Sequence, residues 1–125
     1  MIDSVLAQTY SNWELCLADG SDEKHDYVGK IVAKYAKKDS RILYKKLEKN
    51  LGISGNTNAC LDMSSGDYIT FLDDDDEYLP EKLEKQLELM LSLPLEYGFI
   101  YGSMSYYDNG SHKYLYDHKA IYEGG

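Results

Sequence analysis

Short apolar runs alternate along this chain with segments whose apolar residues recur at helical spacing, and this alternation constrains the fold more than any other feature. Three runs have the length and composition of buried strands: residues 12–18, 41–45 and 67–72. Helices are predicted in the segments that follow them: residues 22–38, 53–64 and 80–93. We expect Gly66 to stop the second helix and Pro80 to open the third. Strands alternating with helices predict an α/β fold with a mostly parallel sheet and helices on its faces.

Two further strand-like runs lie near the C-terminus, at residues 98–107 and 112–116. They flank the sequence Asp108-Asn109-Gly110-Ser111, and an Asn-Gly pair in such a position is a strong signal for a β-hairpin. The chain contains no internal repeat, low-complexity segment or linker. Residues 1–125 are therefore predicted to form a single domain.

Acidic residues outnumber basic ones by 22 to 13, which gives the chain a net charge of -9. This balance argues against a surface for nucleic acid or anionic membranes, because both favour clustered Lys and Arg. A protein this acidic that handles phosphates needs a metal ion to balance the charges. No apolar run is long enough to span a bilayer, and the N-terminus lacks the features of a signal peptide. Cys16 and Cys60 lie within apolar patterns, which predicts reduced core thiols in a cytoplasmic protein.

The strongest local signal is the acidic sequence FLDDDDEYLP at residues 71–80. Consecutive carboxylates repel one another unless solvent or a cation relieves the repulsion. Asp73 and Asp75 are spaced to address one hard divalent ion, and carboxylate oxygens suit Mg²⁺ or Mn²⁺. The alternative is a solvated acidic turn that caps the helix beginning at Pro80.

Two other loops carry weaker signals. In LADGSD, Asp19 follows the first predicted strand and could accept a hydrogen bond from a base N–H group, although Asp-Gly-Ser is also ordinary turn chemistry. Residues 49–60, KNLGISGNTNAC, lead with small polar residues into a helix whose backbone N–H groups could approach a phosphate or ribose. Because ligands of parallel sheets bind beyond the carboxyl ends of the strands, we expect a site there, formed by residues 18–22 and 73–78.

In this order, these segments resemble glycosyltransferase family 2. The resemblance extends from about residue 2 to about residue 92 and is carried by SVLAQTYSNWEL, LADGSD and NLGISGNTNACLDMSSGDYITFLDDDDEYLP. It implies the GT-A fold, a Rossmann-like three-layer sandwich, here incomplete and followed by the C-terminal hairpin. It also implies inverting transfer of a sugar from a nucleotide-diphospho-sugar, usually a UDP-sugar, to a glycan or lipid-linked acceptor.

The resemblance also assigns residues. The DxD metal motif of the family maps onto Asp73 and Asp75, which implies a site for Mn²⁺ or Mg²⁺. Asp75 would contact the metal that bridges the diphosphate, while Asp73 and Asp74 would lie near the ribose and the metal. Asp19 would contact the nucleobase, and Asn58 belongs to the same implied nucleotide-sugar-binding site.

By the same resemblance, the first strand of the family would precede Met1, and the segment with the catalytic base would follow Gly125. The chain is therefore predicted to be truncated at both ends. Asp108, Asp117 and Glu123 are carboxylates in its last part, and we expect none of them to be the base. A missing central strand leaves two unpaired edges, which would close by direct pairing or by strand exchange in a homodimer.

The sequence thus predicts the nucleotide-sugar-binding domain of a glycosyltransferase that builds surface polysaccharide or glycan. It would act in the cytoplasm, at the inner face of the membrane in the full-length protein, and would have little or no transferase activity alone. Two alternatives remain. A nucleotidyltransferase-like domain shares the layout but needs a Gly-rich basic loop that is absent, and a non-catalytic acidic module would use the aspartate loop for metal binding or interaction.

Overall fold

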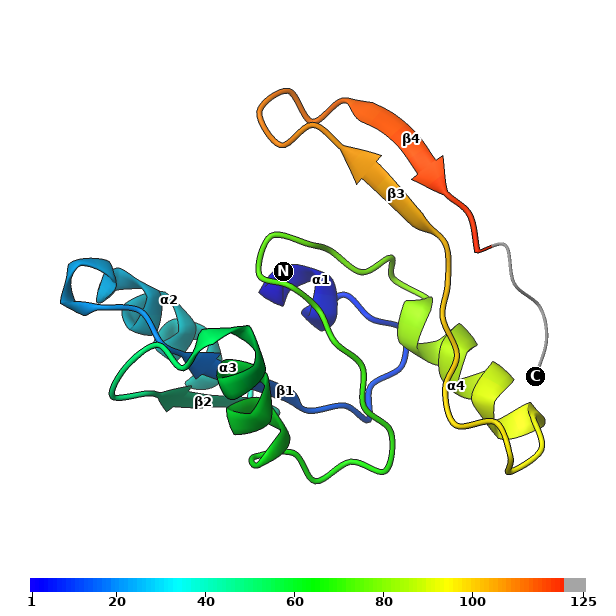
Figure 1. The fold of residues 1–125 in the computed structure, drawn as a ribbon, viewed down its shortest axis with the longest axis horizontal. Coiled ribbons are helices and arrows are strands. Elements are labelled where there is room, and N and C mark those ends of the chain that lie inside the picture. The colour runs from blue at the N-terminus through cyan, green and yellow to red at the C-terminus, as the bar shows by residue number, and fades with distance from the viewer. Residues whose placement is uncertain (121–125) are drawn as a thin grey trace. The chain divides into compact units, whose positions relative to one another are not determined.

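The computed structural model describes residues 1–120 and shows a mixed α/β chain with two separate two-stranded sheets. Its helices and strands are, in order, α1 (Ile2–Leu6), β1 (Leu15–Asp19), the 3₁₀ turn η1 (Glu23–His25), α2 (Tyr27–Ala36), β2 (Ile42–Lys46), α3 (Gly52–Leu61), α4 (Lys82–Ser92), β3 (Met104–Tyr107) and β4 (Tyr114–His118) (Figure 1). The chain divides after Pro80 into two compact units. In the described part, no helix is long and apolar enough to cross a membrane.

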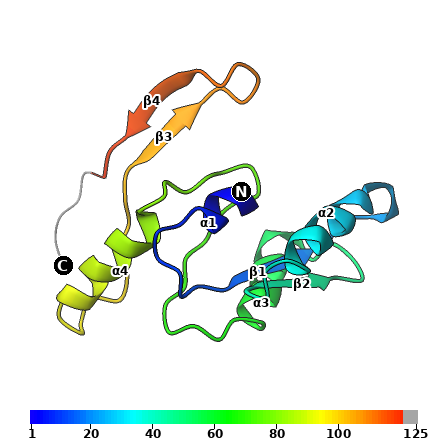
Figure 2. The same ribbon diagram turned by 180° about the vertical axis from the view of Figure 1, so that it is seen from behind.

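The first unit is built on the parallel pair β1–β2, in which Leu15 lies opposite Ile42 and Asp19 opposite Lys46. Helix α3 packs against β1 and α2 against β2, on opposite faces of the pair (Figures 1 and 2). The hydrophobic residues buried among those described are few: Val5, Val32, Ile42, Leu47 and Ala59. Two predicted strands and the helices after them are thereby confirmed, as a small α/β layer structure.

The third predicted strand, residues 67–72, is wrong. This segment pairs with no strand in the described part of the chain, and Tyr68, Ile69 and Phe71 are 54%, 54% and 66% exposed. Aromatic and β-branched residues favour strands because they pack well on a half-buried sheet, and here no neighbouring strand supplies that surface. Direct pairing of residues 67–72 with β1, one of the two expected ways to close the sheet, is wrong as well.

Two helix boundaries also differ from the prediction. Helix α3 ends at Leu61, so Gly66 is not its stop, and α4 begins at Lys82 rather than at Pro80. Its end at Ser92 agrees with the prediction, because the residue before Pro94 is held in an extended conformation.

The two cysteines are free thiols, as predicted, but both are half-buried rather than enclosed in the core. Partial burial, followed by the nearby Glu14 carboxylate, raises the pKa of the Cys16 thiol. The thiol form of this side chain is therefore the stable one at neutral pH.

The second unit contains α4 and the predicted β-hairpin, in which β3 and β4 are antiparallel. Asp108 organises the turn: its N–H donates to the Lys113 carbonyl at 2.8 Å, and its carboxylate accepts from the Ser111 N–H at 2.7 Å. Pairs of tyrosine rings join the strands: Tyr106 stacks on Tyr116 with centroids 4.7 Å apart, and Tyr107 meets Tyr114 edge to face at 5.8 Å.

Candidate functional site

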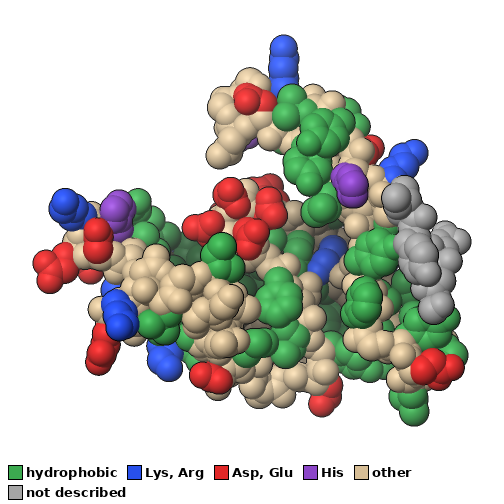
Figure 3. All heavy atoms as spheres, viewed as in Figure 1, with side chains coloured by type: hydrophobic (Ala, Val, Ile, Leu, Met, Phe, Trp, Pro, Cys, Tyr) green, Lys and Arg blue, Asp and Glu red, His purple; other side chains and the backbone are tan. Residues whose placement is uncertain are grey.

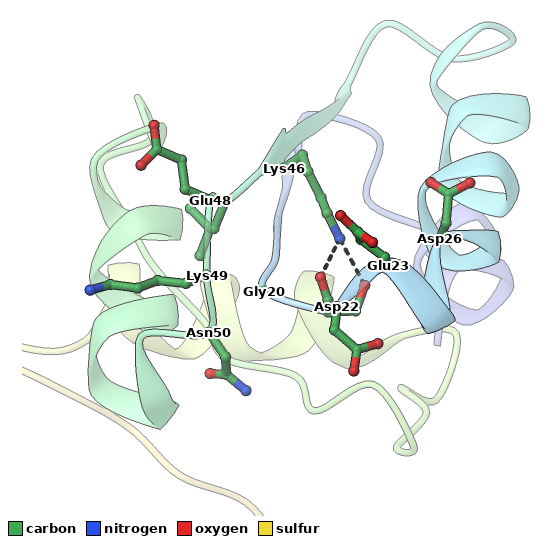
Figure 4. A pocket seen from close by; sticks show the side chains of 10 residues that line it. Gly20, Asp22, Glu23, Asp26, Lys46, Glu48, Lys49 and Asn50 are labelled. Carbon is green, nitrogen blue, oxygen red and sulfur yellow. Dashed lines mark hydrogen bonds between the residues drawn. The ribbon is translucent and has the colours of Figure 1, made fainter.

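A pocket of about 670 Å³ opens where β1 and β2 end, and it is lined by residues 20–23, Asp26 and residues 46–50 (Figure 4). Both lining segments directly follow strands of the parallel pair. The pocket therefore lies where the sequence predicts a site, beyond the carboxyl ends of the strands, and the binding role of the loop after β1 stays a prediction.

Asp19 lies directly behind this lining and is only 8% exposed. Its Oδ1 accepts hydrogen bonds from the Ser21 N–H at 2.8 Å and from the Ser21 hydroxyl at 2.5 Å. Its Oδ2 accepts from the Tyr44 hydroxyl at 2.7 Å and from the Lys46 ammonium at 3.1 Å. A carboxylate offers about four lone-pair positions, so all of them are taken by protein donors.

These donors decide the charge of Asp19. Burial by itself raises the pKa of the carboxyl, but the hydrogen bonds from Ser21, Tyr44 and Lys46 outweigh burial and lower the pKa to about 2. Burial and the Asp19 carboxylate together raise the pKa of Tyr44 to about 12. At neutral pH the cluster therefore holds an ionised carboxylate facing a neutral phenol and an ammonium group.

Gly29 of α2 makes room for this contact. A Cβ atom at Gly29 would lie 2.7 Å from the Tyr44 hydroxyl oxygen and 3.9 Å from Asp19 Oδ2. The hydroxyl is already fixed by its bond to Asp19 and cannot move aside without breaking it. The absence of a side chain at position 29 is thus a condition of the Tyr44–Asp19 hydrogen bond.

The far wall of the pocket is the turn that leads into α3. Asn50 Oδ1 accepts hydrogen bonds from the Gly52 N–H at 2.8 Å and from Asn56 Nδ2 at 3.2 Å, while Asn56 Oδ1 accepts from the Leu51 N–H at 3.1 Å. Gly52 has φ of +74°, a conformation that side chains rarely adopt. A Cβ atom at Gly20 would lie 3.0 Å from the Asn50 Cα, so the two loops approach backbone to backbone.

The acidic residues Asp73–Asp76 are exposed, and no ion pair involves them in the described part of the chain. Acidic side chains gather on the surface of the first unit where this loop lies (Figure 3). Tyr78 closes the loop, because its hydroxyl donates to the Phe71 carbonyl at 2.6 Å and lies 2.8 Å from Thr70 Oγ1.

Helix α1 and the residues after it hold the far end of the acidic loop. The Ser4 hydroxyl accepts from the Tyr78 N–H at 3.2 Å, and Gln8 Nε2 donates to the Leu79 carbonyl at 2.8 Å. The Thr9 N–H donates to the Pro80 carbonyl at 2.9 Å. The segment SVLAQTY therefore positions the chain that follows the aspartates.

The structure does not gather all of the predicted site residues. Asn58 is exposed on α3, and neither it nor Asp73, Asp74 or Asp75 lines the pocket next to Asp19. Within residues 1–120, no three His, Cys, Asp or Glu side chains are grouped as a metal site. The aspartate loop nevertheless offers unpaired, exposed carboxylates, which fit a hard divalent ion if a ligand completes its coordination.

The three carboxylates considered as a base remain unsupported. Asp108 is engaged in its turn, and Asp117 Oδ1 accepts from the Ser105 hydroxyl at 2.7 Å across the hairpin. Glu123 lies outside the described residues. No residue is assigned as the catalytic base.

Sequence reasoning missed Tyr44, Lys46 and Gly29. Tyr44 and Lys46 alternate along RILYKK and so share a face of their strand, which the sequence shows. Their position beside Asp19 depends on the register of the β1–β2 pair, which no local pattern specifies.

Comparison with known proteins identifies the family. The family model described as Glycosyl transferase family 2 matches residues 1–123. The Bacillus subtilis protein named as a teichuronic acid biosynthesis glycosyltransferase, TuaG, is 38% identical over 98 residues, 78% of this chain and 38% of that protein. The Escherichia coli UDP-Glc:alpha-D-GlcNAc-diphosphoundecaprenol beta-1,3-glucosyltransferases WfgD and WfaP are 39% and 37% identical over 110 and 91 residues, covering 88% and 71% of this chain and 41% and 34% of those proteins.

The chain spans about two fifths of the length of the first two of these curated relatives. No solved structure matches it. The family model nevertheless covers almost the whole chain, including both strands that border the pocket and the complete aspartate loop. The chain belongs to glycosyl transferase family 2.

Proposed function

We propose that this chain binds the nucleotide-diphospho-sugar donor, a UDP-sugar, of a glycosyltransferase. The observation that carries the proposal is the pocket at the ends of β1 and β2, with an ionised carboxylate held directly behind its lining. In parallel α/β sheets this is where ligands bind, and hydrogen-bonding groups there fix their orientation. Asp19 would belong to the nucleoside side of the site, and Asn58 would contribute from α3.

The aspartate loop would hold a divalent metal ion, Mn²⁺ or Mg²⁺, through Asp73 and Asp75, with Asp74 near the ribose. When bound, such an ion stabilises the negative charge that develops on a departing diphosphate. The exposed carboxylates of the loop support this role, because they are free to approach an ion that the substrate itself helps to coordinate. The aspartates would hold the ion and orient the donor, and the ion would supply the positive charge that the diphosphate needs.

Membership of the family suggests the fold, the acceptor and the location of the whole protein. We propose that residues 1–125 form part of a single GT-A domain, a three-layer sandwich, in a protein that transfers sugar to a glycan or lipid-linked acceptor. WfgD and WfaP are named for such a donor and acceptor, UDP-glucose and a diphosphoundecaprenol-linked sugar. The protein would act in the cytoplasm at the inner face of the membrane, and residues 1–125 alone would bind donor without transferring it.

Calorimetric titration of UDP, with and without Mn²⁺, tests the proposal. We expect binding that requires the metal and that falls at least about tenfold in Asp75→Asn, because one carboxylate ligand is lost. Asp62→Asn is the matched control, since Asp62 is an exposed aspartate at the end of α3. Mn²⁺ binding without UDP binding would instead support the non-catalytic acidic module.

A further inference from the structure

The net charge of -9 is unevenly distributed along the chain. Residues 24–49, which contain α2 and β2, carry nine of the 13 basic residues and three of the 22 acidic ones. This segment is therefore strongly basic, although the chain as a whole is acidic. A basic surface there can act locally, because exposed charges more than about 8–10 Å apart are largely screened at physiological ionic strength.

Much of this positive charge lies on the outer side of α2. The inner side packs against β2: Val32 is buried there, and Gly29 approaches the Tyr44 hydroxyl (Figure 2). Residues three, four and seven positions apart share one side of a helix, and the helical backbone continues past Ala36 to the next residue. The exposed residues that share the outer side, here called the basic stripe of α2, are Tyr27, Lys30, Ile31, Lys34, Lys37 and Lys38.

The lysines of the basic stripe are mostly not neutralised by neighbours. Lys30 pairs with Asp26 at 2.8 Å, but no ion pair among residues 1–120 involves Lys34, Lys37 or Lys38. Lys30, Lys34 and Lys38 follow one another at i, i+4 spacing, which is unfavourable for like charges. An anionic surface laid on the stripe would relieve this repulsion.

The acidic residues near α2 lie at its two ends. Asp22, Glu23 and Asp26 lie at its beginning, where they line the pocket. Asp39 follows its end and is paired with Arg41 at 2.6 Å. The unneutralised positive charge is therefore strongest in the second half of the basic stripe, away from the pocket.

Two side chains with apolar surface lie among these lysines. Tyr27 is 56% exposed and Ile31 is 46% exposed, although α2 also has a side that is turned to the core. The helix dipole favours cations near a C-terminal end, but it does not account for an exposed isoleucine between lysines. Helices that lie on membranes combine both features, since their cations meet anionic headgroups and their apolar side chains enter the layer below. A nucleic acid offers phosphates to the lysines but no such layer to Ile31.

We infer that the basic stripe of α2 docks the protein on the anionic surface of a lipid bilayer. The inference rests on the proposed function, in which the protein acts at the inner face of the membrane, and it names the surface that makes the contact. The lysine stems would lie along the headgroups with their ammonium groups on lipid phosphates, and Ile31 would enter the boundary with the acyl chains. The pocket, at the acidic beginning of α2, would stay in water.

Sedimentation with lipid vesicles tests the inference on the chain of residues 1–125. We expect binding to vesicles of phosphatidylcholine and phosphatidylglycerol in equal parts, and none to vesicles of phosphatidylcholine alone, which carry no net charge. The double variant Lys34→Gln/Lys38→Gln should bind at least about tenfold more weakly, since each lysine near an anionic surface contributes about fivefold. The matched control is Lys113→Gln/Lys119→Gln, which removes two exposed lysines outside the stripe and should stay within about twofold of the wild type.

Ile31→Ser tests the apolar part of the contact. This variant should bind the anionic vesicles at least about threefold more weakly, because less apolar surface leaves water on docking. An affinity equal to that of the wild type would contradict the insertion of Ile31. A DNA duplex bound as tightly as the vesicles would show instead that the stripe accepts any polyanion.

Two further outcomes would overturn the inference: no binding of the wild type to anionic vesicles, or an equal loss in both lysine pairs. If Lys34→Gln/Lys38→Gln fails to fold by circular dichroism, Lys34→Ala/Lys38→Ala replaces it, since alanine favours helices. Titration of UDP with Mn²⁺ separates this inference from the proposed donor site. UDP binding without vesicle binding overturns the inference alone, whereas vesicle binding without UDP binding overturns the donor site alone.

Discussion

The carboxylate of Glu14 binds Ser65, a residue 51 positions further along the chain, through both its backbone N–H and its hydroxyl. The Gly66 N–H adds a third hydrogen bond at 3.1 Å. The residue before β1 thereby fixes the turn between α3 and the segment that leads to the aspartate loop.

Replacing Glu14 by Gln should loosen that turn. The neutral side chain loses charge-assisted bonds, so amide exchange at Ser65 and Gly66 should become faster in Glu14→Gln. The Ser65 N–H, followed by the Ser65 hydroxyl, lowers the pKa of Glu14 below its usual 4.5. The stabilising effect is therefore present above pH 4.5 and lost as the pH falls below that value. Exchange measured by NMR at pH 7 and pH 3 checks both points, with exposed Glu88→Gln as control.

Asp19→Asn should destabilise the fold in a pH-dependent way. The folded pKa is about 2 against an ordinary 3.8, a difference that corresponds to about 2 kcal/mol of stability above pH 3.8. Because the folded pKa is lowered, this stability is lost as the pH falls from 3.8 towards 2. Urea unfolding of the two proteins should differ by about 2 kcal/mol at pH 7 and converge near pH 2. A difference that is the same at all pH values would contradict the assignment of the charge.

Gly29→Ala should have opposite effects in two backgrounds. With Tyr44 present, the new Cβ lies 2.7 Å from its hydroxyl oxygen and breaks the bond to Asp19, so the change should destabilise by about 1 kcal/mol. In Tyr44→Phe the nearest ring carbon is 3.5 Å away, an ordinary contact, and alanine should stabilise α2 by up to about 1 kcal/mol. Thermal unfolding of the four proteins of this cycle measures the sign change. The same sign in both backgrounds would show that the Tyr44–Asp19 hydrogen bond does not require a glycine at position 29.

Tyr78→Phe should make the two ends of the acidic loop more mobile. The variant loses the hydroxyl that joins Phe71 and Thr70, and the net cost is about 1 kcal/mol for such a hydrogen bond. Hydrogen exchange followed by mass spectrometry should show faster exchange across residues 70–78. Tyr68→Phe removes a hydroxyl from a tyrosine that is 54% exposed, and exchange in that variant should match the wild type.

Elements of this fold that depend on local sequence patterns can be predicted from the sequence, whereas those that depend on long-range pairing cannot. The runs at β1 and β2 and the Asn-Gly turn of the hairpin were predicted correctly, because their patterns are local. Residues 67–72 carry an equally good strand pattern and form no strand, since a strand exists only where a partner accepts its backbone hydrogen bonds. A strand-like pattern shows that a segment can form a strand, but the segment forms one only where another strand pairs with it.

The candidate site shows the same division. Asp19 stood out because it ends an apolar run, and the aspartate loop because of its charge. The donors that fill the Asp19 carboxylate come from the next strand, 25 and 27 residues away. Only the register of the parallel pair places these donors beside Asp19, and a single sequence taken alone does not show that register.

All the described hydrogen bonds that anchor the aspartate loop to the rest of its unit come from residues outside positions 73–77: Ser4, Gln8, Thr9, Thr70, Phe71 and Tyr78. No described side-chain hydrogen bond or ion pair involves residues 73–77 themselves. No described side-chain hydrogen bond or ion pair therefore depends on which residues occupy these positions. The number and order of carboxylates in this loop can therefore change, and with them the ion that the proposed metal site prefers, without removing any of the described hydrogen bonds on either side of it.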